Sequence, residues 1–84
     1  MSEKLIDYLS EQCGLYVSDL SRPGTFSIIL PIIYDLSASL FSAEDWSASL
    51  SYLFKKPLNF ETSETAKNYC IKTLLLYLAS TKSS

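Results

Sequence analysis

The 84-residue sequence predicts an all-α fold: a small, compact bundle of about four helices, of which the final helix is the longest and most apolar. Apolar residues recur every three or four positions, as they do along one face of an α-helix. Ser or Thr stands just before acidic residues at several points, which is typical of helix starts. The one segment rich in strand-forming residues, 26–30, has no second strand with which to pair. We therefore expect a single helical domain over residues 1–79 and a frayed tail over residues 80–84.

The first helix is expected over residues 3–13. Ser2 is a suitable N-cap, and Glu3 places a negative charge in the first turn. Gly14 follows at the position where many helices end in the left-handed conformation. The next three residues form either a short extended stretch or a helical turn.

The second helix is expected over residues 28–41, after a turn at residues 22–24. Thr25 or Ser27 can cap it, and Pro31 is compatible with this helix if Ser27 is the N-cap. The proline then lies in the first turn, where its missing N–H would have no intrahelical partner.

The third helix is expected over residues 43–55. Ser42 is its N-cap, and Glu44 and Asp45 in the first turn complement the helix dipole. Pro57 follows the last turn and stops the helix.

The fourth helix is expected over residues 63–79, with Thr62 or Ser63 as its N-cap. Its second half is apolar nearly all round, with only Lys72 and Thr73 as polar breaks. Such a helix is buried by neighbours on more than one side. The residues expected in the core of the domain are Leu5, Ile6, Leu9, Ile29, Ile33, Leu36, Leu40, Trp46, Leu50, Leu53, Cys70, Leu74 and Leu78.

A short motif occurs twice, ten positions apart: residues 35–40 read DLSASL and residues 45–50 read DWSASL. With a corner at Ser42, the two copies belong to separate helices, and each has its large residues four positions apart on one stripe. The Ser-Ala-Ser segments lie off that stripe. They form either a solvated face or a surface of small side chains that another helix approaches closely.

The composition contains more apolar residues than a chain of this size easily buries. It is 48% hydrophobic and 19% charged, against about 25% charged in ordinary soluble domains. A domain this small buries only about two-thirds of the surface of its unfolded chain. The surplus either fills the core, with Tyr and Ser covering the outside, or forms an interface with another molecule.

The charge pattern argues against nucleic acid and against an anionic membrane surface as partners. The net charge is −2, and the seven basic residues are scattered, whereas binding to phosphates draws on clustered Lys and Arg. No apolar run reaches the roughly 20 residues of a membrane span, and the N-terminus has no apolar signal-peptide core.

The sequence predicts no enzyme, no cofactor and no metal site. It contains no histidine, the commonest general base and metal ligand. The carboxylate pairs lie at expected helix starts, where capping explains them. Cys13 and Cys70 are expected to be reduced, partly buried thiols of a cytoplasmic protein; a disulfide between the first and last helices is the alternative.

The expected function is that of a non-enzymatic protein–protein interaction module: a homodimer, or a small adaptor or regulatory subunit that docks on a larger protein through apolar helix faces. The alternative is a helix-turn-helix-like nucleic-acid-binding transcriptional regulator, built from the second and third helices around the corner at Ser42. Against it, Glu44 and Asp45 would face the phosphates. The candidate partner-binding residues are Trp46, Phe54, Phe60, Tyr69, Ile71, Leu75 and Tyr77.

Overall fold

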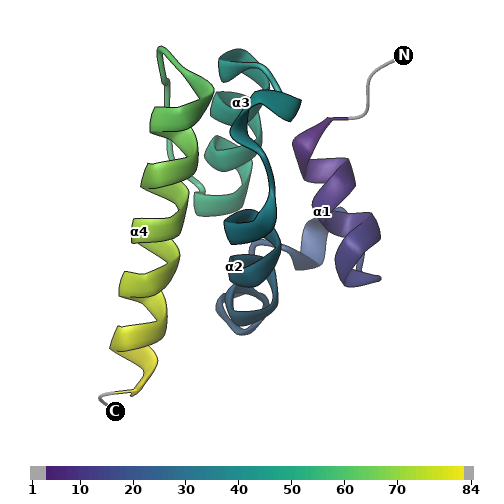
Figure 1. The fold of residues 1–84 in the computed structure, drawn as a ribbon. Coiled ribbons are helices and arrows are strands. Elements are labelled where there is room, and N and C mark those ends of the chain that lie inside the picture. The colour runs from purple at the N-terminus through teal and green to yellow at the C-terminus, as the bar shows by residue number, and fades with distance from the viewer. Residues whose placement is uncertain (1–3, 83–84) are drawn as a thin grey trace.

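The computed structural model describes residues 4–82, which form four α-helices: α1 (Leu5–Cys13), α2 (Phe26–Asp35), α3 (Ala43–Phe54) and α4 (Ser63–Lys82) (Figure 1). Three 3₁₀-helices lie in the connections: η1 (Val17–Asp19), η2 (Pro23–Thr25) and η3 (Ala38–Leu40). Within residues 4–82 there is no strand. The predicted all-α bundle is confirmed, and α4 is its longest helix.

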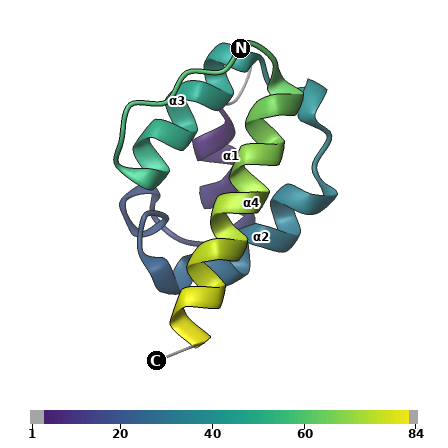
Figure 2. The same cartoon turned by 90° about the vertical axis from the view of Figure 1, so that its left-hand side faces the viewer.

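The helices form three layers. α2 and α3 lie in the middle, with α1 on one side and α4 on the other (Figures 1 and 2). Both outer helices pack against both middle helices. The C-terminal turns of α4 extend beyond the rest of the bundle in both views.

The core lies between these layers, and most of the predicted core residues are in it. The predicted residues that are buried are Leu5, Leu9, Ile29, Ile33, Leu36, Trp46, Leu50, Leu53, Cys70 and Leu74. Ile6 and Leu78 are only half-buried against this core. The core also contains four residues that were not predicted: Leu20, Phe26, Phe54 and Ala66.

The prediction for the end of the second helix was wrong. The helix was expected to run to Phe41, but α2 ends at Asp35, and Leu36 is extended, with ψ 135°. The first copy of the repeated motif is therefore mostly outside any α-helix. Leu40, which was expected in the core, lies in η3 and is 64% exposed.

Side chains from α3 and α4 hold the chain in this shape after α2. The Lys67 ammonium on α4 donates to the Leu36 carbonyl, and Trp46 Nε1 on α3 donates to the Ala38 carbonyl at 3.0 Å. These two carbonyls would bond within the helix if α2 continued. Because tertiary partners satisfy them instead, α2 stops.

The beginning of the second helix also differs from the prediction. α2 begins at Phe26 with Thr25 as its N-cap, so Pro31 is inside the helix and not in its first turn. The proline deprives the Ser27 carbonyl of its intrahelical donor. Ser27 and Pro31 are both exposed, which leaves that carbonyl on the solvent side of α2.

The end of α1 and the start of α3 follow the predicted signals closely, but α1 begins at Leu5 and not at residue 3, with Lys4 as its N-cap. Gly14 is left-handed, with φ 68°, and its N–H reaches carbonyls of the last turn of α1. Ser42 Oγ accepts from the Asp45 N–H at 3.1 Å, as expected of the N-cap of α3. The proposed cap at Ser2 and the first-turn acid at Glu3 lie outside the described residues.

The final helix is longer than predicted and is not the most apolar. The expected tail over residues 80–84 is helical through Lys82, because no Gly or Pro follows Ala79 to end the helix; residues 83–84 lie outside the described part of the chain. α2 has the most apolar composition, with Ser27 and Asp35 as its only polar residues.

Candidate functional site

The serines of α3 bind other segments of the same chain. Ser47 Oγ accepts from the Phe60 N–H, and Ser51 Oγ accepts from the Leu58 N–H, both at 2.9 Å. Ser47 and Ser49 are buried. The sequence left two interpretations of the Ser-Ala-Ser motif: a solvated face, or a surface that another segment approaches closely. The second describes residues 47–49, and the segments that approach them belong to the same chain.

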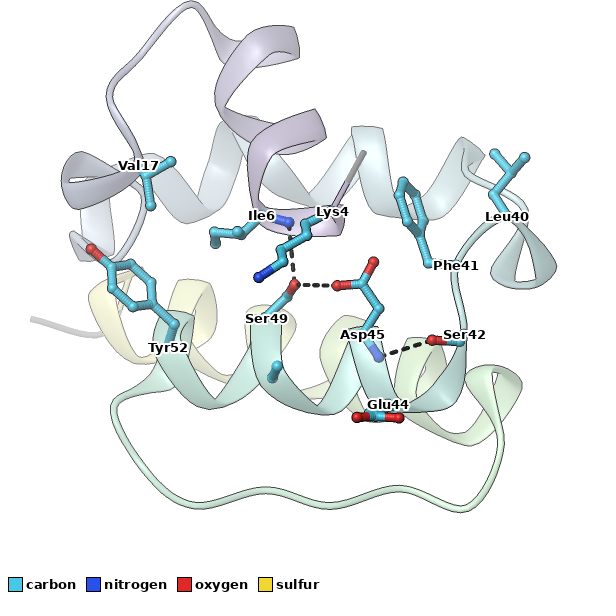
Figure 3. Close-up of a pocket in the computed structure, with 11 residues that line it drawn as sticks. Lys4, Ile6, Val17, Leu40, Phe41, Ser42, Glu44, Asp45, Ser49 and Tyr52 are labelled. Atoms are coloured by element: carbon cyan, nitrogen blue, oxygen red, sulfur yellow. Dashed lines mark hydrogen bonds between the residues drawn. The ribbon is translucent and has the colours of Figure 1, made fainter. Parts of the chain in front are cut away.

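The other side of α3 caps α1. Asp45 Oδ2 accepts from the Leu5 N–H at 3.1 Å. Figure 3 shows the neighbouring contact, in which Ser49 Oγ accepts from the Ile6 N–H at 3.2 Å. N–H groups in the first turn of a helix have no acceptor within the helix. The N-cap residue of α1, Lys4, supplies none from its side chain, so Asp45 and Ser49 take that part. The Asp45 carboxylate and the Ser49 hydroxyl thus have a structural role.

Beside these contacts, α1, α3 and the end of η3 border an open groove of about 560 Å³, which we call the α1–α3 groove. Figure 3 shows Tyr52 at one end of it and Leu40 and Phe41 at the other. Ile6 and Ala48 add further apolar surface to the lining. Leu40 and Tyr52 are 64% and 41% exposed, respectively, so the groove is apolar and open to solvent.

The charges in the groove are few. Glu44 and Asp45 carry two carboxylates, and Lys4 carries one ammonium. No group of three or more His, Cys, Asp or Glu side chains that could hold a metal ion occurs within residues 4–82. Ser49 Oγ lies 3.5 Å from Asp45 Oδ1 and also accepts from the Ile6 N–H, so its hydrogen-bonding capacity serves the capping of α1.

Both cysteines are free thiols, as one of the two interpretations of the sequence expected. Cys70 on α4 is fully buried, and this burial raises the pKa of its thiol to about 12. Cys13, at the end of α1, is half-buried, and burial raises the pKa of its thiol as well. A raised pKa keeps a thiol protonated at neutral pH, which lowers its reactivity.

Two of the predicted partner-binding residues lie in the core. Trp46 is fully buried, and Phe54 is 6% exposed. The Phe54 ring packs against the rings of Phe26, Tyr69 and Tyr77, with centroids 5.7 to 6.2 Å apart. Neither Trp46 nor Phe54 offers a side chain at the surface, and this part of the prediction is corrected.

The other predicted residues lie along α4 or against it. Phe60 and Tyr69 are half-buried and contact each other, with ring centroids 5.2 Å apart. Ile71 is half-buried against the core. Leu75 and Tyr77 are 49% and 41% exposed, respectively, so these two of the seven expose much of their side chains.

The exposed apolar residues of α4 lie in its C-terminal half, and the sequence prediction missed one of them. We define the α4 end as residues 75–79. Leu76 is 62% exposed, more than either of its neighbours Leu75 and Tyr77. Successive residues of a helix are about 100° apart, so three consecutive large apolar residues cannot all face one core. That pattern could have pointed to Leu76.

Comparison with known proteins adds no functional assignment. No family model matches the chain, and neither the curated proteins nor the solved structures contain a match. None of the helices in residues 4–82 is long and apolar enough to cross a membrane. The fold, the α1–α3 groove and the α4 end are therefore the basis for a functional proposal.

Proposed function

We propose that this protein is a non-enzymatic protein–protein interaction module that binds its partner through the α4 end. The observation that carries the proposal is the exposure of Leu75, Leu76 and Tyr77 in the C-terminal half of α4, whose last turns extend beyond the bundle (Figures 1 and 2). Fully burying one leucine side chain contributes about 1.5–3 kcal/mol. A partner that covers this end would gain that free energy.

The arrangement of these residues matters more than their number. Single exposed apolar side chains are common on soluble proteins and need no explanation. A contiguous apolar group is different, because it marks a binding surface or an aggregation hazard. Leu75, Leu76 and Tyr77 are consecutive, and Ala79 continues the exposed surface one turn after Leu75.

The nucleic-acid-binding alternative gains no support. A helix-turn-helix has a turn of only three or four residues between its two helices. Here residues 36–42, which include η3, separate α2 from α3. The first turn of α3 also carries Glu44 and Asp45, which would repel phosphates.

The proposal is tested with Leu76→Glu, because Leu76 is the most exposed of the three residues and its replacement leaves the core intact. Asn59→Glu is the matched control: it adds the same charge at an exposed position in the connection between α3 and α4. Association is measured by sedimentation over a concentration series, and by capture of other proteins on the immobilised chain.

We expect the wild type and Asn59→Glu to associate, and Leu76→Glu to lose that association while it keeps the same circular dichroism spectrum. A wild type that stays monomeric at every concentration, and that captures the same proteins as Leu76→Glu, would show that the α4 end is not a binding surface.

A further inference from the structure

We infer that the α4 end of one molecule docks into the α1–α3 groove of a second copy, which makes a head-to-tail assembly. The inference rests on the proposed function and names the partner of the same α4 end. It follows from three features: a division of charge along the chain, the apolar character of both surfaces, and their positions on opposite sides of the bundle.

Charge is divided unequally between α4 and the rest of the chain. Residues 65–84 contain three lysines and no acidic residue, whereas all nine acidic residues and only four basic ones lie in residues 1–64. Of these lysines, Lys72 is exposed on α4, whereas the Lys67 ammonium donates to the Leu36 carbonyl within the chain. An apolar, basic helix fits best against an apolar surface of acidic character.

Lys72 places a basic group on α4 one turn before the α4 end. Lys72, Leu76 and Ala79 are spaced by four and three residues, so they lie on one side of the helix, and all three are exposed. A surface that receives this side needs apolar area for Leu76 and a carboxylate within reach of the Lys72 ammonium.

The α1–α3 groove supplies both. Its apolar lining includes Leu40, Phe41 and Tyr52, and Glu44 and Asp45 place two carboxylates on its α3 wall against the single ammonium of Lys4. Its volume of about 560 Å³ lies within the range of about 300–1,000 Å³ that is usual for ligand-binding clefts. The groove is thus apolar with a net negative lining, opposite in charge to Lys72, which lies beside the α4 end.

The two surfaces of one molecule cannot meet each other. α1 and α4 form the outer layers on opposite sides of α2 and α3, and the last turns of α4 extend beyond the bundle (Figure 1). Docking is therefore between molecules. Because the two surfaces differ, the contact is heterologous, and repeated contacts build rings or open chains of molecules.

A symmetric dimer through two α4 ends fits less well. It would cover only the four exposed residues of each α4 end, Leu75, Leu76, Tyr77 and Ala79, whereas a stable interface buries about 800 Å² on each partner. Head-to-tail docking covers the α4 end and the groove together. It thereby includes five of the eight large apolar side chains that are exposed in residues 4–82: Leu40, Tyr52, Leu75, Leu76 and Tyr77.

The test uses one variant for each surface. Leu76→Glu damages the α4 end and leaves the groove intact. Ala48→Arg fills the groove and adds a positive charge to it; Ala48 is an exposed helix residue, so the core is unchanged. Asn59→Glu and Asn59→Arg are the matched controls, since they add the same charges at one exposed site that borders neither surface. Assembly is measured by sedimentation velocity over a concentration series.

We expect the wild type and both Asn59 variants to form dimers and larger species. Leu76→Glu and Ala48→Arg should each raise the dissociation constant about tenfold or more. The decisive sample is an equal mixture of these two variants. Together they retain one intact α4 end and one intact groove, so the mixture should form a 1:1 dimer and nothing larger.

Several results would overturn the inference. Ala48→Arg that assembles like the wild type would show that the groove takes no part, as in a symmetric α4 dimer. A mixture that stays monomeric would exclude a heterologous contact. A monomeric wild type would exclude self-association; if it still captures another protein that Leu76→Glu does not capture, the proposed function stands and only the self-docking fails.

Discussion

Asp45 and Leu5 are 40 residues apart in the sequence, yet the Asp45 carboxylate accepts a hydrogen bond from the Leu5 N–H at 3.1 Å. An acidic side chain in the first turn of α3 thus serves as a cap for the first turn of α1. Ser49, one turn further along α3, does the same for Ile6. The start of α1 is held by α3 in place of a local cap.

We expect Asp45→Ala to lower the free energy of unfolding by about 1–2 kcal/mol, the usual cost of losing a helix cap. The substitution leaves the Leu5 N–H without its acceptor. Glu44→Ala is the matched control, because Glu44 is also an acid in the first turn of α3 but is exposed. Urea unfolding followed by circular dichroism measures both; equal losses in the two variants would contradict a specific cap at Asp45.

Ser51 holds the segment after α3. Its Oγ accepts from the Leu58 N–H at 2.9 Å and lies 2.7 Å from the Ser47 carbonyl oxygen. Ser51→Ala should lower the free energy of unfolding by about 1 kcal/mol, since it leaves a part-buried N–H unpaired. Ser39→Ala, at an exposed hydroxyl, should change it far less. Thermal melts of the two variants compare these effects, and a Ser51→Ala melt at or above that of the wild type would refute the role.

Pro31 interrupts the hydrogen bonds of α2 from the inside. Pro31→Ala restores an N–H for the Ser27 carbonyl, at an exposed position where alanine meets no obstacle. Inside a helix, proline destabilises the folded state by about 3 kcal/mol relative to alanine. Proline also lowers the conformational entropy of the unfolded chain, which stabilises the folded protein by about 0.4–1 kcal/mol. The variant should therefore be more stable by about 1 kcal/mol or more, and its melting temperature should rise. A fall would indicate that the helix depends on the proline.

The Cys70 thiol links stability to alkaline pH. Burial raises its pKa in the folded protein from the ordinary 9.0 to about 12, so between these values the unfolded chain loses the thiol proton while the folded chain keeps it. Unfolding is then favoured as the pH rises, and the stabilising contribution is complete only below pH 9.0.

We expect the urea midpoint to fall between about pH 8 and about pH 10, and to fall less in Cys70→Ala, which lacks the group. The comparison of the two pH-dependent changes removes the contribution of tyrosines and lysines, which titrate in both proteins. An identical fall in both would show that Cys70 does not contribute.

Only some of the predicted partner-binding residues are exposed, and the reason is physical. Leu75 and Tyr77 are exposed, as expected of a chain with more apolar residues than its core can cover. Trp46 and Phe54 were chosen because large aromatic residues are common in interfaces. The same residues are also common in cores, and nothing in the sequence distinguishes the two uses. For Phe54, the packing of the Tyr69 and Tyr77 rings of α4 against it shows that the residue belongs to the core.

Local signals in the sequence determined the helices and several of their ends. Ser42 caps α3 and Gly14 ends α1 because these interactions involve neighbours within three or four residues. The apolar periodicity likewise determined most of the core. Each of these features depends on residues that are close in the chain, so a reading of the sequence can recover them.

The tertiary structure alone decided where α2 stops, what caps α1 and which apolar residues remain outside. Lys67 bonds to the Leu36 carbonyl from 31 residues away, and Asp45 reaches Leu5 from 40 residues away. Hydrogen bonds between distant residues compete with local ones. They form here because a buried N–H or carbonyl cannot bond to water, so leaving it unpaired is costly. The α4 end and the α1–α3 groove are likewise products of the assembled layers, since a side chain is exposed only in relation to what the rest of the chain covers.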